Sequence, residues 1–236
     1  DQDIALLHHL VKGVLKMALN LYYIIEQLCN KEKYAKTDIK IKVLLYLGLY
    51  QLRYCSGIAD HGSVHPIVEI AKERYDKKVA DYVNAVLREY QRSQEINYPN
   101  DPIKRLSREY SFPEELIEVW LELWNKEDVE MLCNYLNEPA KLSFRVNKMA
   151  TSKKRLINYF KRKDIEVKEI DISENILITS QVYETLNDVS FSEGYFSIQD
   201  ASAAMVVELL NPQEDSSILD LFAGPGGKCS YVSEIM

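Results

Sequence analysis

A glycine-rich turn close to residue 225 is the part of the sequence best suited to chemistry. Residues 217–222 are mostly apolar and predict a buried strand, which leads into a turn that opens a helix. In open α/β sheets, a turn of this kind brings backbone amides against a cofactor at the carboxyl end of a strand. The predicted cofactor-binding residues are Phe222, Ala223, Gly224, Pro225, Gly226, Gly227 and Lys228.

The spacing of this turn excludes two common phosphate-binding loops. A P-loop would need Gly and Ser or Thr where this sequence has Phe222 and Cys229, and a dinucleotide fingerprint would need its third Gly at Cys229. Pro225 stiffens the turn, and its glycines remove side chains that would keep a ligand away from the backbone. A close-fitting turn without pyrophosphate machinery suits a smaller cationic ligand such as S-adenosylmethionine.

Two ordered motifs carry a family resemblance. Residues 219–228, LDLFAGPGGK, resemble the first cofactor motif of the RNA (cytosine-5) methyltransferases, usually LDLCAAPGGK, with Phe222 and Gly224 as departures. Residues 194–202, GYFSIQDAS, are similar to the segment that precedes that motif in the family. The resemblance implies that residues 196–236 are the truncated start of a Rossmann-like α/β methyltransferase domain whose parent protein uses S-adenosyl-L-methionine. The cofactor site is expected to be incomplete in this segment.

The resemblance also implies a mechanism based on thiols. In the family, one Cys thiolate attacks C6 of cytosine to activate C5, a second Cys assists elimination, and these residues follow Pro and Thr. None of the cysteines here, Cys29, Cys55, Cys133 and Cys229, follows Pro or Thr. The expected catalytic residues therefore lie beyond Met236, and the segment alone is expected to be inactive.

Residues 1–95 predict a helical bundle. Apolar residues recur at helical spacing over residues 4–15 and 21–28, and Asp38 is placed to cap a central helix over 39–54. Residues 57–63 predict a turn, with Pro66 at the start of the next helix, and a last helix is expected over 79–92. Residues 47–52, 64–72 and 82–88 resemble the RNA-binding NusB domain, which implies RNA binding.

The order of segments resembles the RsmB or Sun branch of the ribosomal RNA (cytosine-5) methyltransferases, in which a NusB-like domain precedes the catalytic part. A polar linker over about 93–105 leads to helices predicted at 116–123 and 128–136, so residues 96–140 form a helical bridge. By this resemblance we expect the first NusB-like helix to be missing before Asp1, and the chain to be truncated at both ends.

Residues 141–195 predict a small α+β domain of ferredoxin-like or RRM-like type. Alternation over 142–146 predicts a strand, 152–163 a basic helix, and 165–170 and 176–179 two further strands. Seven residues make about two helical turns, so Lys154 and Lys161, and likewise Arg155 and Arg162, lie along one stripe of the helix. The candidate RNA-binding residues are Arg145, Asn147, Lys154, Arg155, Lys161 and Arg162.

Composition agrees with this assignment. The net charge is −7, but an RNA-binding protein needs only one basic face. No apolar run could span a bilayer and no leader opens the chain, which favours the cytoplasm. The cysteines are scattered, and Gly62 and Pro66 predict a break in any helix that would pair His61 with His65, so no metal site is expected.

The sequence therefore predicts part of a methyltransferase that makes 5-methylcytosine in small-subunit ribosomal RNA. This segment would supply RNA binding and the first cofactor loop, with ribosomal RNA as partner, no membrane association and a monomeric state. The alternative is a non-catalytic NusB-like RNA-binding or antitermination module in which the glycine turn is vestigial.

Overall fold

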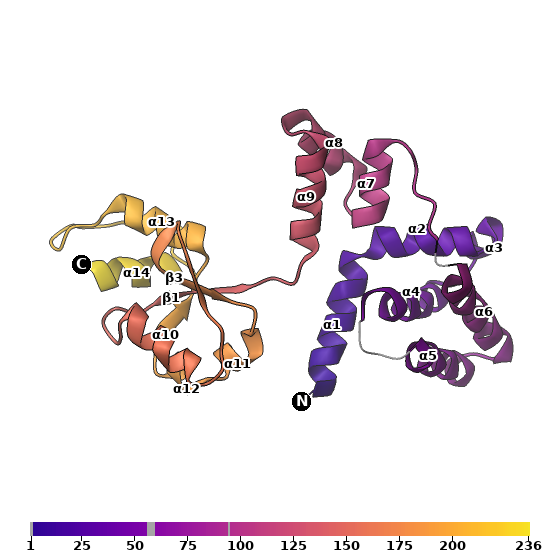
Figure 1. The fold of residues 1–236 in the computed structure, drawn as a ribbon, viewed down its shortest axis with the longest axis horizontal. Coiled ribbons are helices and arrows are strands. Elements are labelled where there is room, and N and C mark those ends of the chain that lie inside the picture. Colours follow the sequence, from indigo (N-terminus) through magenta and orange to yellow (C-terminus); the bar gives the residue numbers. More distant parts are fainter. Residues whose placement is uncertain (1, 56–59, 94) are drawn as a thin grey trace. The chain divides into compact units, whose positions relative to one another are not determined.

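The chain forms two compact units. The computed structural model describes residues 2–55, 60–93 and 95–236 (Figure 1). The first unit is Asp1–Glu138 and is helical, whereas the second is Pro139–Met236 and contains a four-stranded sheet. Within the described ranges, no helix combines the length and apolar character needed to cross a lipid bilayer.

In the described part of the first unit, six helices make the bundle. They are α1 (Gln2–Lys16), α2 (Ala18–Leu28), α3 (Lys31–Ala35), α4 (Ile39–Tyr54), α5 (Asp60–Arg74) and α6 (Lys77–Ser93). Helix α4 packs against α1, α2, α5 and α6, as its predicted central position requires. The Asp38 carboxylate caps it by accepting a hydrogen bond from the Lys40 amide at 2.7 Å.

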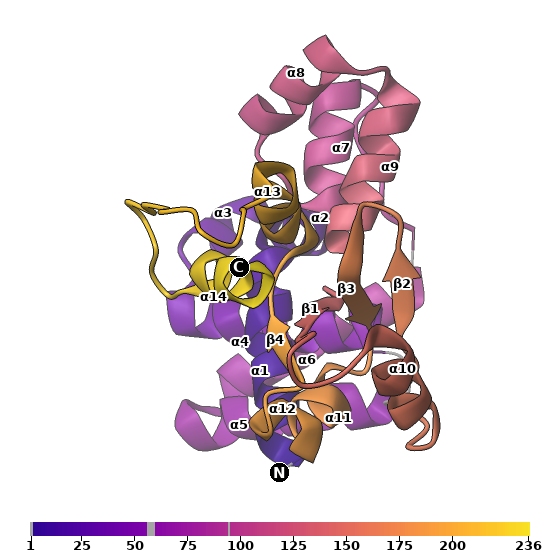
Figure 2. The same ribbon diagram turned by 90° about the vertical axis from the view of Figure 1, so that its left-hand side faces the viewer.

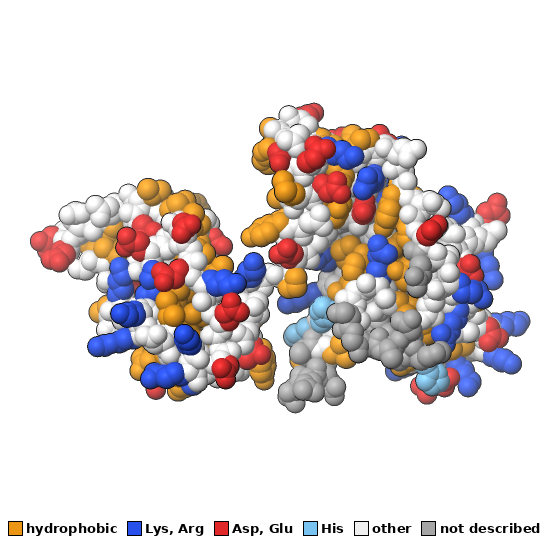
Figure 3. Space-filling model, in the orientation of Figure 1, with side chains coloured by type: hydrophobic (Ala, Val, Ile, Leu, Met, Phe, Trp, Pro, Cys, Tyr) orange, Lys and Arg blue, Asp and Glu red, His pale blue; other side chains and the backbone are white. Residues whose placement is uncertain are grey.

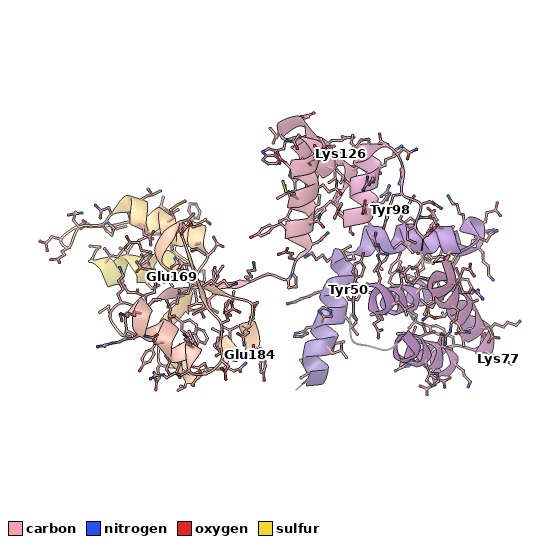
Figure 4. All side chains as sticks on the ribbon, in the orientation of Figure 1. Tyr50, Lys77, Tyr98, Lys126, Glu169 and Glu184 are labelled. Atoms are coloured by element: carbon pink, nitrogen blue, oxygen red, sulfur yellow. The ribbon has the colours of Figure 1, made fainter. Side chains whose placement is uncertain are left out.

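Close packing around α4 depends on two glycines. A Cβ on Gly48 would lie 2.5 Å from Leu87 Cδ1, so this glycine lets α4 approach α6. A Cβ on Gly13 would lie 2.0 Å from the ring of Tyr50, a residue of α4 that lies beside α1 (Figure 4). The bundle core includes Leu45 and Leu49, both fully buried.

The turn predicted over residues 57–63 is too long, because its last four positions are helical. Helix α5 already begins at Asp60 and continues through Pro66 to Arg74, although proline removes one backbone donor. Burial of Val64, Ile67 and Ala71 against the neighbouring helices favours the helix over the break that the proline predicted. The backbone is thus helical from position 61 to His65, and the side chain of His61 lies outside the described residues.

Among the residues that the structure describes, the first unit also contains the helices α7 (Pro102–Tyr110), α8 (Glu114–Leu123) and α9 (Lys126–Asn137). They share a small core of Leu106, Ile117, Val129 and Cys133. Asn20 of α2, fully buried, donates hydrogen bonds from Nδ2 to the Arg108 carbonyl at 2.8 Å and to the hydroxyl of Tyr98 at 2.9 Å (Figure 4). The amide therefore ties the bundle to the end of α7.

The second unit is built on an antiparallel sheet with strand order β2-β3-β1-β4. The strands are β1 (Leu142–Val146), β2 (Lys168–Ile170), β3 (Ser173–Thr179) and β4 (Phe196–Ile198). The last strand was not predicted, and its pairing of Val146 with Phe196 carries the sheet past residue 195. The first three strands agree with the predicted α+β order.

Helices cover both faces of this sheet (Figure 2). One face packs Phe144 and Leu177 against α10 (Lys153–Lys161), with α11 (Val182–Leu186) and α12 (Val189–Ser192) following β3. The other face packs Ile176 against α13 (Ala201–Leu210) and α14 (Gly227–Ile235). The sheet is therefore an inner layer.

The strand predicted at 217–222 is absent. Residues 217–222 have no regular strand, and Leu219, Leu221 and Phe222 are 82%, 76% and 87% exposed. A parallel strand is stable when neighbours pair with it and helices cover it. No strand of the described residues pairs with this segment, so its apolar sequence does not produce one.

Candidate functional site

The glycine turn has an open backbone. Gly226 has φ +107°, a conformation that favours glycine, and its amide donates to the Ala223 carbonyl at 2.6 Å. A Cβ added to Gly224 or Gly226 would meet no atom within 4 Å. Packing within the described residues thus leaves the space above these glycines free for a ligand.

Helix α14 begins directly at the turn. Gly226 is its N-cap and offers no side chain to the first amides of the helix. The first turn of a helix carries unsatisfied amide donors and a partial positive charge, which together favour an anionic group. The predicted residues Gly227 and Lys228 belong to this first turn.

Beneath the turn lies Arg145 of β1, whose guanidinium is fully buried. Its Nη2 donates to Glu234 Oε1 at 2.6 Å and to Ser230 Oγ at 3.2 Å, and its Nη1 donates to the Gly227 carbonyl at 3.1 Å. The guanidinium also lies 4.4 Å from the ring centre of Tyr231. These contacts hold Gly227, Ser230, Tyr231 and Glu234 of α14 against β1.

These contacts correct the prediction for Arg145. Alternation along β1 placed Arg145 on a solvent face that would contact RNA, but α13 and α14 cover that face. A buried charge is stable only when it is paired and hydrogen-bonded, and here Glu234 supplies the opposite charge. Arg145 is a positioning residue for the turn, because its donors are directed inward.

Gln199 adds an unused donor beside the turn. Its side chain is 5% exposed, and its Oε1 accepts a short hydrogen bond from Arg145 Nη1. Its Nε2 has no hydrogen-bond partner among the described residues and lies 3.9 Å from where a Cβ of Gly227 would be. A buried donor without a partner costs free energy, so a ligand that accepts from it would bind favourably.

An open apolar hollow of about 730 Å³ flanks the turn between α13, α14 and residues 218–222. This volume is within the usual range of small-molecule sites. Leu219, Phe222, Cys229 and Val232 are among its walls. Polar donors at the turn and an apolar hollow beside it suit a small ligand with an anionic group at one end and an apolar ring system at the other.

The cysteine thiols are not set up as nucleophiles. Burial and the nearby Asp220 carboxylate raise the pKa of Cys229, although the start of a helix would lower it. Burial raises the pKa of Cys133 to about 11, and it also raises the pKa of Cys29 and Cys55. The described residues contain no cluster of three His, Cys, Asp or Glu side chains that could hold a metal ion.

The remaining RNA candidates are Asn147, just after β1, and four residues of α10 and its end. Asn147 is occupied by the local backbone: its Nδ2 donates to the Gly194 carbonyl at 2.9 Å and its Oδ1 accepts from the Met149 amide at 3.0 Å. The other four candidates are exposed along α10 and its end: Lys154, Arg155, Lys161 and Arg162. Lys and Arg side chains gather over this part of the second unit (Figure 3).

Sequence reasoning missed three residues around the turn. Gln199 stands in the quoted GYFSIQDAS segment, so its position signalled a role that was not assigned to it. Ser230 and Glu234 belong to no recognised motif. Their spacing of four residues predicts only that both lie on the same side of α14.

Comparison with known proteins identifies two families within the chain. Residues 1–92 match the NusB family, and residues 112–184 match the ferredoxin-like domain of RsmF/B-like methyltransferases. The crystal structure of PH0851 aligns with 98% of this chain and 53% of its own, with a TM-score of 0.70 and 20% identity. A methyltransferase homolog protein from Pyrococcus horikoshii aligns with 58% of this chain and 45% of its own, with a TM-score of 0.51 and 21% identity.

Curated relatives match along the whole chain. A probable ribosomal RNA small subunit methyltransferase B of Bacillus subtilis is 35% identical over 100% of this chain and 53% of its own length. The protein of the same name in Synechocystis is 32% identical over 96% of this chain and 51% of its own. The chain thus spans about half the length of these relatives. The chain therefore joins a segment that matches the NusB family to one that matches the ferredoxin-like domain of RsmF/B-like methyltransferases.

Proposed function

We propose that this chain is part of a cytoplasmic S-adenosylmethionine-dependent methyltransferase that forms 5-methylcytosine in small-subunit ribosomal RNA. The segment binds RNA and supplies the first cofactor turn, and catalysis needs thiols that this sequence does not contain. The observation that carries the proposal is the open glycine turn, found in a chain similar along its whole length to proteins named ribosomal RNA small subunit methyltransferase B.

The cofactor half of the proposal rests on donors around the turn. S-adenosylmethionine, when bound, supplies an electrophilic methyl group. The amides of Gly227 and Lys228 at the start of α14, together with Gln199 Nε2, would hold its carboxylate. Arg145 would keep these donors in place through the Gly227 carbonyl.

The RNA half rests on uncompensated charge. Lys154, Arg155, Lys161 and Arg162 form no ion pair within the described part of the chain, whereas Lys153 pairs with Glu169 of β2 (Figure 4) and Lys163 with Asp188. Basic side chains without acidic neighbours are available to phosphates. We therefore assign RNA backbone contact to α10, and general RNA binding to the NusB-family bundle.

Two binding measurements on the 236-residue chain test both halves. Fluorescence anisotropy with small-subunit ribosomal RNA hairpins should show binding that weakens steeply with salt, because phosphate contacts release counterions. Calorimetry should show S-adenosylmethionine binding that Gln199→Leu weakens, with Gln199→Glu as a second variant that removes the donor. Absence of any RNA binding would refute the RNA half, and equal cofactor binding by all three proteins would refute the assigned donor.

A methyl-transfer assay tests the expectation of inactivity. Labelled S-adenosylmethionine and ribosomal RNA should give no labelled RNA with this segment alone, since none of its four cysteines follows Pro or Thr, as the catalytic thiols of the resembled family do. Transfer by the segment would show that one of these cysteines, or another group, does the chemistry.

A non-catalytic NusB-like RNA-binding module is the second candidate. The exposure of Leu219, Leu221 and Phe222 favours it, because an apolar segment that pairs with no strand among the described residues is expected where the turn is no longer part of a working sheet. RNA binding that persists when S-adenosylmethionine binding is undetectable would support this module and contradict the cofactor assignment.

A further inference from the structure

A recess of about 360 Å³ lies on the α10 side of the second unit. Its walls include Thr151, Arg155, Asn158, Tyr159, Arg162 and Tyr195. The glycine turn is at α14, which packs on the opposite face of the sheet. The recess is therefore separate from the cofactor turn.

Two uncompensated guanidinium groups border the recess. Arg155 and Arg162 are seven residues apart, about two helical turns, so they lie on the same side of α10. Both are exposed, and neither forms an ion pair among the described residues. Paired guanidinium groups favour bidentate contact with a phosphate.

The aromatic walls are held in place by their neighbours. The Tyr159 hydroxyl donates to Asp188 Oδ1 at 3.0 Å, and Lys163 Nζ lies 4.7 Å from the ring centre. The backbone of Tyr195 is bonded on both sides, with its amide donating to the Ser190 carbonyl and its carbonyl accepting from the Asn147 amide, both at 2.9 Å. The Tyr159 ring, held by these contacts, loses little conformational freedom when a base stacks on it, and the backbone bonds fix the point from which the Tyr195 ring projects.

The sheet itself cannot offer a stacking surface. Many RNA-binding α+β domains stack bases on aromatic side chains of an exposed sheet. Here the sheet aromatics Phe144 and Phe196 are 0% and 1% exposed beneath helices. Base contacts in this unit must therefore use aromatic rings outside the sheet, and the recess has two.

We propose that the recess binds one unstacked nucleotide of a single-stranded RNA segment. Its phosphate lies between Arg155 and Arg162, and its base packs against the tyrosine walls. The inference rests on the proposed RNA-binding function and adds the form of RNA that α10 recognises.

The test of base contact compares two probes on the full 236-residue chain. One is a single-stranded RNA 12-mer, and the other is the same 12-mer with abasic nucleotides, which keep the phosphates. The natural chain should bind the first at least roughly fivefold more tightly, since stacking adds affinity for each base. Tyr195→Leu should bring this ratio close to one, whereas Tyr195→Phe, which keeps the ring, should preserve it.

The test of phosphate contact uses a matched pair of variants. Arg155→Gln/Arg162→Gln and Lys154→Gln/Lys161→Gln remove the same charge from the same exposed helix. The arginine pair should weaken binding roughly tenfold more than the lysine pair and lower the salt slope by about 0.7, the value for one single-strand phosphate. Circular dichroism and thermal unfolding verify that each variant is folded.

The outcomes separate the two proposals. Equal losses from both pairs, together with an unchanged abasic ratio in Tyr195→Leu, would overturn the recess while leaving RNA binding intact. Failure of the natural chain to bind any RNA would overturn both proposals. Displacement of the 12-mer by a poly-glutamate peptide at equal concentration would also overturn the nucleotide assignment, because it would show a general anion site.

Discussion

Arg145 Nη2 lies 2.6 Å from Glu234 Oε1, which joins the central strand of the sheet to the last helix across 89 residues of sequence. The Arg145 side chain is 0% exposed and that of Glu234 is 10% exposed. Removal of one member of a buried ion pair costs more than the pair contributes, because the other charge stays buried without compensation. The pair therefore sets the position of α14 and of the turn before it.

Glu234→Leu should destabilise the second unit by about 3–5 kcal/mol, since it leaves the guanidinium without its counter-charge. Urea unfolding followed by far-UV circular dichroism measures the change in the free energy of unfolding. The double variant Arg145→Met/Glu234→Leu should lose less than the sum of the single variants.

A surface pair provides the control for this measurement. Lys168 and Glu166 are both 70% exposed, so Lys168→Gln should change stability by less than about 0.5 kcal/mol. A Glu234→Leu effect as small as that of Lys168→Gln would contradict the role of Arg145.

Gly226→Ala should destabilise the turn by about 1–3 kcal/mol, because a side chain is strained at φ +107°. Gly224→Ala is the matched control, since a Cβ there meets no atom within 4 Å and Gly224 lacks the positive φ. Thermal unfolding should separate the two variants in the absence of ligand. If S-adenosylmethionine approaches the backbone closely, both variants should weaken its binding in calorimetry; unaltered binding by Gly224→Ala would place the ligand elsewhere.

Asn20→Leu should destabilise the first unit by about 1–3 kcal/mol, because it leaves buried hydrogen-bonding groups without partners. The Tyr54 hydroxyl loses its acceptor, Asn20 Oδ1, at 2.7 Å, and the Arg108 carbonyl loses its donor. Chemical denaturation measures the loss. The control is Asn97→Ala, because the Asn97 side chain is not in this network. An equal loss of stability in both variants would contradict the role of Asn20.

The Asp188 carboxylate makes the second unit sensitive to acid. Burial opposes its ionisation, but hydrogen bonds from Lys163, Ser190 and Tyr159 outweigh burial and lower its pKa to about 2. A carboxyl with a lowered pKa in the folded state stabilises the fold above its unfolded pKa of about 4, and this stability is lost as pH falls toward 2. Asp188→Asn should therefore reduce stability at pH 7 by about 1–3 kcal/mol and by much less at pH 2. An equal difference at both pH values in urea unfolding would contradict this linkage.

The helices were predicted well where caps and apolar stripes agree. Asp38 was identified as a helix start from sequence, and its carboxylate accepts the capping hydrogen bond. The error at Pro66 shows the limit of local signals, because packing of α5 overrides the preference of proline for the first helical position. Local propensity is a weak guide where tertiary burial is extensive.

The site was harder to predict than the fold. The glycine turn was located by its motif, and the structure gives its backbone an open conformation. The face occupied by Arg145 could not be predicted, because alternation distinguishes the two faces of a strand but does not say whether helices cover both. The strand expected at 217–222 failed for a related reason: its apolar pattern needs partner strands that the described residues do not provide.

The 89-residue separation of Arg145 from Glu234 also has a consequence for synthesis of the chain. At roughly 5–20 residues per second, the strand bearing Arg145 leaves the ribosome about 4–18 seconds before its partner. During that interval the uncovered side of β1 presents a guanidinium to water instead of another aliphatic side chain. We expect this charge to keep the nascent sheet hydrated and to discourage its aggregation until α14 arrives.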